Sequence, residues 1–174
     1  MNKFFTACSA LLCATGAQAA IIDTYQVGTG LNTSTVQVDF QNGNGYLFEV
    51  SWQGAGTTGW DLMVTIADEI DGFDLDFSTS EWGVFLMGIT AFDDNDWGTG
   101  AGWQDGIEDY WHYWTSDSMG DPWVSSMVGV DSSLVSDGSM DGWVFMSPDA
   151  PQLVPAPGAI ALLAIGFAAR RRRR

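Results

Sequence analysis

The chain has very few basic residues, and none of them lies in its central part. It contains six Lys or Arg against 22 Asp or Glu. Residues 20–153 hold no Lys or Arg, so His112 is the only side chain there that could form a salt bridge. This charge balance excludes nucleic acid and disfavours an anionic membrane surface as partners, because phosphate recognition depends on Lys and Arg. Repulsion among the carboxylates also predicts that salt or divalent cations favour the folded state.

Cysteine is also scarce, and both copies, Cys8 and Cys13, lie near the N-terminus. The first 19 residues combine a positively charged start, an apolar stretch, and Ala17 and Ala19 in the small-x-small spacing of a signal-peptide cleavage site. We therefore expect a signal peptide over residues 1–19, with the export machinery and a signal peptidase as partners. Both cysteines would leave with it, which excludes disulfides from the mature body.

The C-terminal end has little that could pack as a domain. Residues 148–157 are expected to be a linker with a processing motif, and residues 158–174 hold a short apolar run and five terminal arginines. The run is shorter than the ~20 residues of a typical spanning helix, so we expect only transient anchoring in the inner membrane. The arginines would stay on the cytoplasmic side, which leaves the Pro-rich turn facing outwards. The expected sorting and processing residues are Val154, Pro155, Ala156, Pro157, Gly158, Arg170, Arg171, Arg172, Arg173 and Arg174.

This order of turn, apolar segment and arginines resembles the PEP-CTERM sorting signal of bacterial exosortase substrates. The resemblance covers residues 154–174, and Ala156 stands where the motif has Glu. It implies an exosortase-type protease as a partner, and delivery to the outer envelope, the cell surface or an extracellular matrix of exopolysaccharide. The alternative interpretation of the same residues is an ordinary short C-terminal membrane anchor.

The central part is nevertheless a folding sequence, which we expect to form one domain over residues 20–147. The chain is 46% apolar with 9 Trp, so it can bury a substantial core. Alternating residues 35–40 and 46–52, joined by a turn rich in Asn and Gly, predict a β-hairpin. Met63, Ile66, Ala67 and Ile70 recur at helical spacing and predict an amphipathic helix over residues 60–70.

The rest of the domain is predicted to be strands and loops. The run 82–90 is continuously apolar, as expected of a strand covered on both faces, and 92–106 is expected to be a long loop. This order predicts an α+β fold, mainly an antiparallel β meander packed on one helix. The other predicted strands are 74–80, 110–115, 139–146 and a short one within 123–127.

Residues 36–145 resemble the small β-grasp-type domain found at the C-terminus of transcobalamin and in many bacterial surface proteins. The resemblance implies a β-grasp-like architecture. The cobalamin ligand is not implied, because it needs a large helical partner domain. The motifs that carry the resemblance are the hairpin, Thr57-Thr-Gly-Trp60, Trp82-Gly-Val-Phe85, Tyr110-Trp-His-Tyr-Trp114, and Asp137-Gly138 before Trp143.

An acidic segment offers hard oxygen ligands of the kind that Ca²⁺ takes. Its candidate metal ligands are Asp93, Asp94, Asp96 and Asp105, with calcium as the candidate cofactor. The spacing does not fit the EF-hand rule, because Gly98 and Asp105 fall at positions 5 and 12 when counted from Asp94. A solvated acidic loop without a metal is therefore the alternative.

Three classes of function remain open. The favoured one is a noncatalytic exported surface or matrix protein. The second is a secreted carbohydrate-binding module, with or without assistance from calcium, in which exposed rings of Trp97, Trp103, Trp111 or Trp114 stack on sugars. The third and least favoured is a small hydrolase using His112, because no nucleophile elbow accompanies that residue. Exposure of the Trp rings separates the first two classes.

Overall fold

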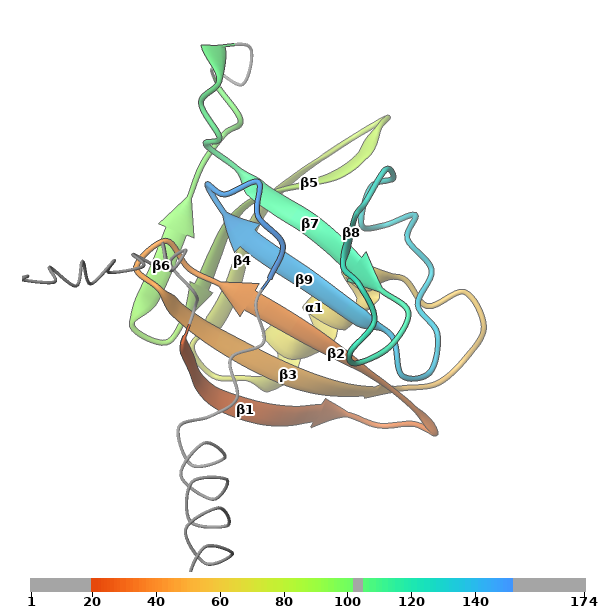
Figure 1. Cartoon of the computed structure of the whole chain (residues 1–174). Coiled ribbons are helices and arrows are strands. Elements are labelled where there is room, and N and C mark those ends of the chain that lie inside the picture. The colour runs from red at the N-terminus through yellow and green to blue at the C-terminus, as the bar shows by residue number, and fades with distance from the viewer. Residues whose placement is uncertain (1–19, 102–104, 152–174) are drawn as a thin grey trace, which may run out of the picture.

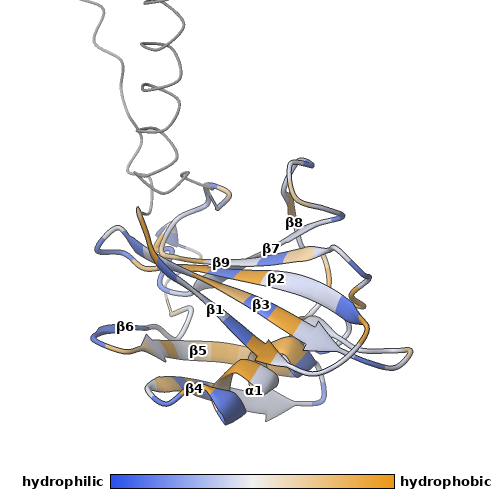
Figure 2. Cartoon of the chain, turned by 90° about the horizontal axis from the view of Figure 1, so that it is seen from below, coloured by the Kyte–Doolittle hydropathy of each residue, from blue (hydrophilic) through white to orange (hydrophobic). Residues whose placement is uncertain are grey.

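In the computed structural model of the chain, residues 20–101 and 105–151 are described, and they form two layers (Figures 1 and 2). One layer is a six-stranded sheet with the strand order β1-β3-β2-β9-β7-β8. The other holds helix α1 and a three-stranded sheet with the order β4-β5-β6. The elements are β1 (Ala20–Gly28), β2 (Asn32–Asp39), β3 (Asn44–Trp52), α1 (Gly59–Glu69), β4 (Phe73–Ser80), β5 (Gly83–Ala91), β6 (Asp94–Trp97), β7 (Trp111–Ser116), β8 (Val124–Ser125) and β9 (Met140–Phe145).

The predicted hairpin is confirmed as β2 and β3, which pair antiparallel from Asn32↔Trp52 to Asp39↔Gly45. Gly43 takes a positive φ of 88° in the turn, and the Asn42 side chain accepts a hydrogen bond from the Asn44 amide at 2.9 Å. Such a turn needs a residue that tolerates positive φ, which glycine does at no steric cost.

The predicted helix is confirmed as α1. Thr58 caps it: the Thr58 hydroxyl accepts from the Asp61 amide at 3.3 Å, and the Asp61 carboxylate accepts from the Thr58 amide at 2.8 Å. This capping box satisfies amides that the first turn leaves free. Leu62, Met63 and Ile66 are fully buried, so α1 presents its apolar stripe to β1, β3 and β4. Within the described residues, no helix has the length and apolar character needed to cross a bilayer.

The core lies between the two layers. Phe48 on β3, which is fully buried, packs edge-on against Phe73 on β4 with 5.0 Å between ring centroids. Tyr25 from β1 stacks on Phe48 at 5.6 Å and on Phe92 at 5.0 Å. These rings join the six-stranded sheet to the smaller one, so neither sheet has an independent core.

The α+β class with mainly antiparallel strands is confirmed, but the connectivity is more complex than a meander. Two neighbouring pairs, β1 with β3 and β2 with β9, are parallel. The strand β1 was not expected at all. Parallel pairing joins segments far apart in the chain, so no hairpin turn announces it in the sequence.

Two local predictions are wrong. The segment 92–106 was expected to be a loop, yet Asp94–Trp97 pairs with β5 as strand β6. The strand at 82–90 was expected to be covered on both faces, yet Phe85 is 42% exposed. In both cases position in the smaller sheet overrides composition, because β6 and β4 are its edges and its outer face meets solvent.

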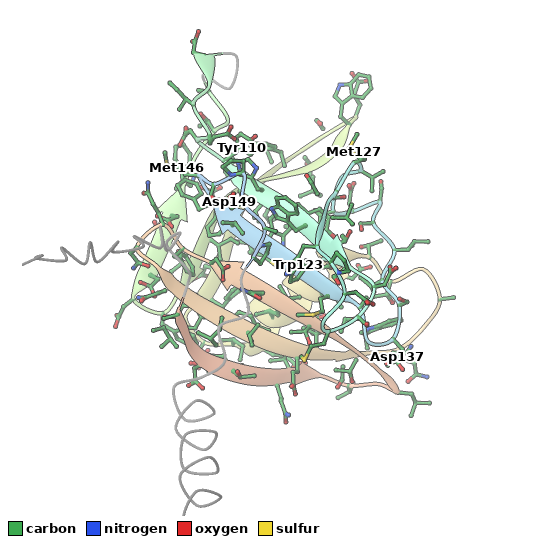
Figure 3. The ribbon with its side chains drawn as sticks, viewed as in Figure 1. Tyr110, Trp123, Met127, Asp137, Met146 and Asp149 are labelled. Atoms are coloured by element: carbon green, nitrogen blue, oxygen red, sulfur yellow. The ribbon has the colours of Figure 1, made fainter. Side chains whose placement is uncertain are left out.

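The folded body also extends beyond the predicted boundary at residue 147. Pro151 is fully buried. A Cβ on Gly142 would lie 2.4 Å from the Pro151 ring and 3.1 Å from the Trp123 ring. Both rings therefore cover the face of β9 that is turned away from α1, where Figure 3 shows Trp123. The predicted signal peptide, the processing residues 154–158 and the arginines at 170–174 lie outside the described residues.

Candidate functional site

The tryptophans divide by exposure. Trp82 and Trp97 are 88% and 51% exposed, whereas Trp111 and Trp143 are buried. Of the predicted ligand-binding rings, Trp103 lies outside the described residues. A ring stacks on a ligand only through an open face, which Trp97 and Trp82 have and Trp111 and Trp143 do not. The other described tryptophans, Trp52, Trp60, Trp114 and Trp123, are partly buried.

The prediction that Trp111 binds a ligand is wrong. Its ring is 5% exposed and packs against Phe40 and Phe145, with 5.4 Å and 5.2 Å between centroids. Successive strand residues face opposite sides, so Trp111 points to the core and Trp114 to the other face of β7. The sequence could not separate them, because β7 carries rings on both faces.

Trp97 is held in a fixed orientation on the outer face of the three-stranded sheet. Its indole Nε1 donates a hydrogen bond to the Asp76 carboxylate at 2.7 Å. The ring lies against Gly88 on β5, where a Cβ would be 2.7 Å from Trp97 Cδ1. Asp76, Gly88 and Trp97 are direct neighbours across β4, β5 and β6. The glycine therefore lets the ring lie close to the sheet while about half of it stays exposed.

The next row of the same face is polar. Asp74, Thr90 and Asn95 are opposite each other across the three strands. The Asn95 amide bonds to the Thr90 hydroxyl, and Asp74 is exposed. Rows two residues apart along a strand are separated by about 7 Å. We call these six residues, Asp74, Asp76, Gly88, Thr90, Asn95 and Trp97, the Trp97 platform.

A polar pocket of about 370 Å³ lies beside this platform, between the β2–β3 turn and the start of β6. Asp94, which is 7% exposed, lines it. Its carboxylate accepts hydrogen bonds from Asn42 at 2.6 Å and Tyr46 at 2.7 Å, and Asn44 Nδ2 lies 3.0 Å from both oxygens. The pocket is lined by Phe40, Gln41, Asn42, Asp93, Asp94, Asn95 and Asp96.

These contacts set the charge states in the pocket. Burial raises the pKa of Asp94, but the hydrogen bonds from Tyr46, Asn42 and Asn44 together outweigh it, so its pKa lies below the ordinary value. Burial raises the pKa of Asp96, and the Gln41 amide, 2.7 Å away, only partly offsets this. Asp94 is thus an ionised anchor that ties the hairpin turn to β6.

The predicted calcium site is not formed. Asp93, Asp94 and Asp96 line one pocket, whereas Asp105 does not. Across residues 20–101 and 105–151, no group of three or more His, Cys, Asp or Glu side chains could hold a metal ion. Asp94 and Asp96 lie on the same face of β6, and Asp93 lies in the turn before it. Asp94 is in addition already bound by three side chains of the chain itself.

Replacing Asp94 by Asn should lower the free energy of unfolding at pH 7 by about 2 kcal/mol, because the new amide would face donors that need an acceptor. The loss should disappear as the pH falls below the lowered pKa of Asp94, since its contribution exists only while it is ionised. Urea denaturation of the wild type and the variant, at pH 7 and at a pH below the lowered pKa of Asp94, measures the loss. Asp93→Asn, in the same pocket but exposed, is the matched control and should change little. Equal losses from the two variants would contradict the anchoring role.

His112 lies beside Glu108. Its Nε2 lies 2.9 Å from Glu108 Oε2, without the alignment of a hydrogen bond, and its ring stacks on Tyr110 with 4.2 Å between centroids. Burial lowers the pKa of His112, and Glu108 only partly restores it. A hydrolase would need a second carboxylate and an open pocket around this ring. Glu108 supplies the first of these carboxylates.

The predicted ligand-binding residues did not include Gly88, although the sequence contains a signal for it. This glycine interrupts the apolar run of β5. An isolated glycine inside a strand often marks a site where another group approaches closely. Asp76 and Trp97, at the two edges of that sheet, could only be matched to it once the register was known.

Comparison with solved structures finds a likeness of fold. No family model matches the chain, and no curated protein matches it. A crystal structure from Ruminococcus gnavus, described as a "putative metal binding protein", is similar over 68% of this chain and all of the other. The TM-score is 0.45 at 15% sequence identity, so nothing about metal binding transfers to this chain.

Proposed function

We propose that this protein is a noncatalytic, exported surface or extracellular-matrix protein. The observation that carries the proposal is the distribution of charge. All six basic residues lie in the two ends, outside an acidic folded body with 22 carboxylates. Basic residues confined to the ends suit signals that are read during export and then removed. The body that remains is polyanionic and suited to a solvated exterior.

Removal of both ends would not cut the described fold. Both predicted processing sites lie outside the described elements, the first of which is β1 from Ala20. The Ala20 nitrogen donates a hydrogen bond to the Gly43 carbonyl at 2.8 Å. An α-amino group created by cleavage would keep this hydrogen bond. Processing at both predicted sites would leave every described helix and strand intact.

We propose that calcium, where the matrix supplies it, acts on this body as a diffuse counter-ion and not as a resident cofactor. The carboxylates are spread over the described elements, and none of their groups could hold the ion. Screening of repulsion among exposed carboxylates needs no coordination site. Export machinery, a signal peptidase and an exosortase-type protease remain the expected partners, and the envelope or exopolysaccharide the expected destination.

Mass spectrometry of the protein recovered from its native organism tests this proposal. We expect a mature N-terminus at Ala20, a processed C-terminus near residues 154–158, and recovery from the envelope or the medium. Ala19→Leu, which places a bulky residue at the cleavage site, should block the first cut. Recovery from the cytosol with all five arginines present would refute the proposal.

A further inference from the structure

The ring of Trp97 is exposed and yet held in place by two contacts. One face of the indole covers Gly88, which leaves the other face open. The Asp76 carboxylate fixes its in-plane direction through the 2.7 Å bond from Nε1. Half of the ring remains exposed. A rigid aromatic face loses little conformational entropy when a flat apolar surface stacks on it.

The surroundings of the ring define what can stack there. Carboxylates accept hydrogen bonds and do not donate them, whereas sugar hydroxyls can donate. Asp74 and Asn95 are exposed beside the ring, and Asn95 also carries an amide donor. A pyranose ring with all its hydroxyls equatorial has a flat C–H face for an indole and hydroxyls around its edge for such neighbours. The platform offers both kinds of contact side by side.

Charge decides which polymer is acceptable. The described residues contain no Lys or Arg, and the platform itself carries Asp74 and Asp76. An anionic glycan would meet like charge with no cation to offset it. A strongly cationic polymer would be attracted to the whole acidic body and would not need this face. An uncharged glycan is the partner whose binding depends on the ring itself.

We propose that the Trp97 platform binds an uncharged polysaccharide of all-equatorial pyranose units, such as a β-linked glucan. One sugar ring stacks on Trp97, and its hydroxyls bond to Asp74, Asn95 and Thr90. Asp76 is a positioning residue that holds the indole in its stacking orientation. This inference rests on the proposed function only in that an exported body meets such a polymer outside the cell.

Calorimetric titration of the full exported chain with cellohexaose tests the inference. We expect Trp97→Ala to weaken binding at least about tenfold, as removal of a central aromatic anchor does. Trp82→Ala is the matched control: this ring is 88% exposed on the β4–β5 turn and lies outside the platform. It should leave binding unchanged. Absence of binding to the wild-type chain, or equal losses from the two variants, would overturn the inference.

Two further variants separate positioning from simple loss of structure. Asp76→Ala should weaken binding severalfold because the indole loses its acceptor, whereas Asp76→Asn keeps an oxygen that accepts from Nε1 and should restore it. Circular dichroism verifies that each variant is folded. Tetragalacturonate, an anionic probe, should not bind, and tighter binding of that probe than of cellohexaose would overturn the charge argument. These binding measurements do not depend on where the termini are cut. Glycan binding can therefore be absent although the protein is exported, and it can be present although the proposed export is wrong.

Discussion

Replacing Asp141 by Asn should make the protein more stable at pH 8 by up to about 4 kcal/mol. Asp141 on β9 is 3% exposed, and burial raises its pKa to about 7, although the hydrogen bond from Tyr113 partly opposes this. The folded carboxyl therefore loses its proton about three pH units above the ordinary value of 3.8, and each unit corresponds to about 1.4 kcal/mol. An asparagine carries no charge and avoids that cost.

The difference between the pKa of Asp141 in the folded state, about 7, and its ordinary value of 3.8 sets the sign of the pH dependence. Between pH 4 and 7 the folded state holds a proton at Asp141 that the unfolded state has released, so stability due to this group falls as the pH rises through that window. Below pH 4 both states are protonated, and the variant should match the wild type.

The structure around Asp141 suits a neutral group. Oδ1 accepts from the Tyr113 hydroxyl at 3.1 Å, and Oδ2 is buried with no hydrogen-bond partner in the described structure. Gly59, at the first turn of α1, approaches so closely that a Cβ there would lie 2.7 Å from Oδ2. The Asn amide would occupy the place of the protonated oxygen without added volume.

Urea denaturation of wild type and Asp141→Asn at pH 4 and pH 8 measures the effect. Asp117→Asn, in the exposed turn after β7, is the control and should change stability little at either pH. A variant that is less stable than the wild type at pH 8 would show that Asp141 is ionised and stabilised in the folded state, contrary to this account.

Replacing Phe48 by Ala should cost about 3 to 5 kcal/mol, the usual loss when a buried aromatic ring is removed. Phe48 is fully buried and contacts Tyr25 on β1 and Phe73 on β4. It is therefore one of the rings through which the two sheets meet. The cavity would lie between the layers, and the surrounding strands are too constrained to close it.

Thermal unfolding and urea titration of Phe48→Ala measure this loss. Phe85→Ala removes the same side chain from the smaller sheet, where it is 42% exposed, and should cost well under half as much. A small loss at Phe48 would mean that the two sheets are not stabilised by packing on this ring.

Local patterns predicted several elements well. The hairpin is encoded by alternation around Gly43, and helix α1 by apolar spacing after the Thr58 cap. Both depend on contacts within a short stretch of chain. The parallel pairs β1–β3 and β2–β9 depend on partners that no tight turn joins, so no short window contains their cause. The edge strand β6 is joined to β5 by a short turn, but its Asp and Asn residues have low strand propensity and gave no strand signal.

At the candidate site, too, the sequence identified residues that only the tertiary structure could place. The sequence named Trp97 and Trp111 together, as rings that would stack on sugars if they were exposed. Only the register places Trp97 over Gly88 beside Asp76, and only the packing of two layers buries Trp111. The acidic segment 93–96 was identified as special, but its role as a tie between the hairpin and β6 required the Tyr46 and Asn44 contacts.

By itself, the sequence determined that the folded body is acidic, free of cysteine after the predicted first cut, and without Lys or Arg, because these are properties of composition that folding cannot change. The tertiary structure decided which carboxylates are buried, which tryptophans meet solvent and which strands are neighbours. The physical reason is that burial and pairing are set by the joint packing of distant segments, and each side chain's exposure is known only when all of them are in place.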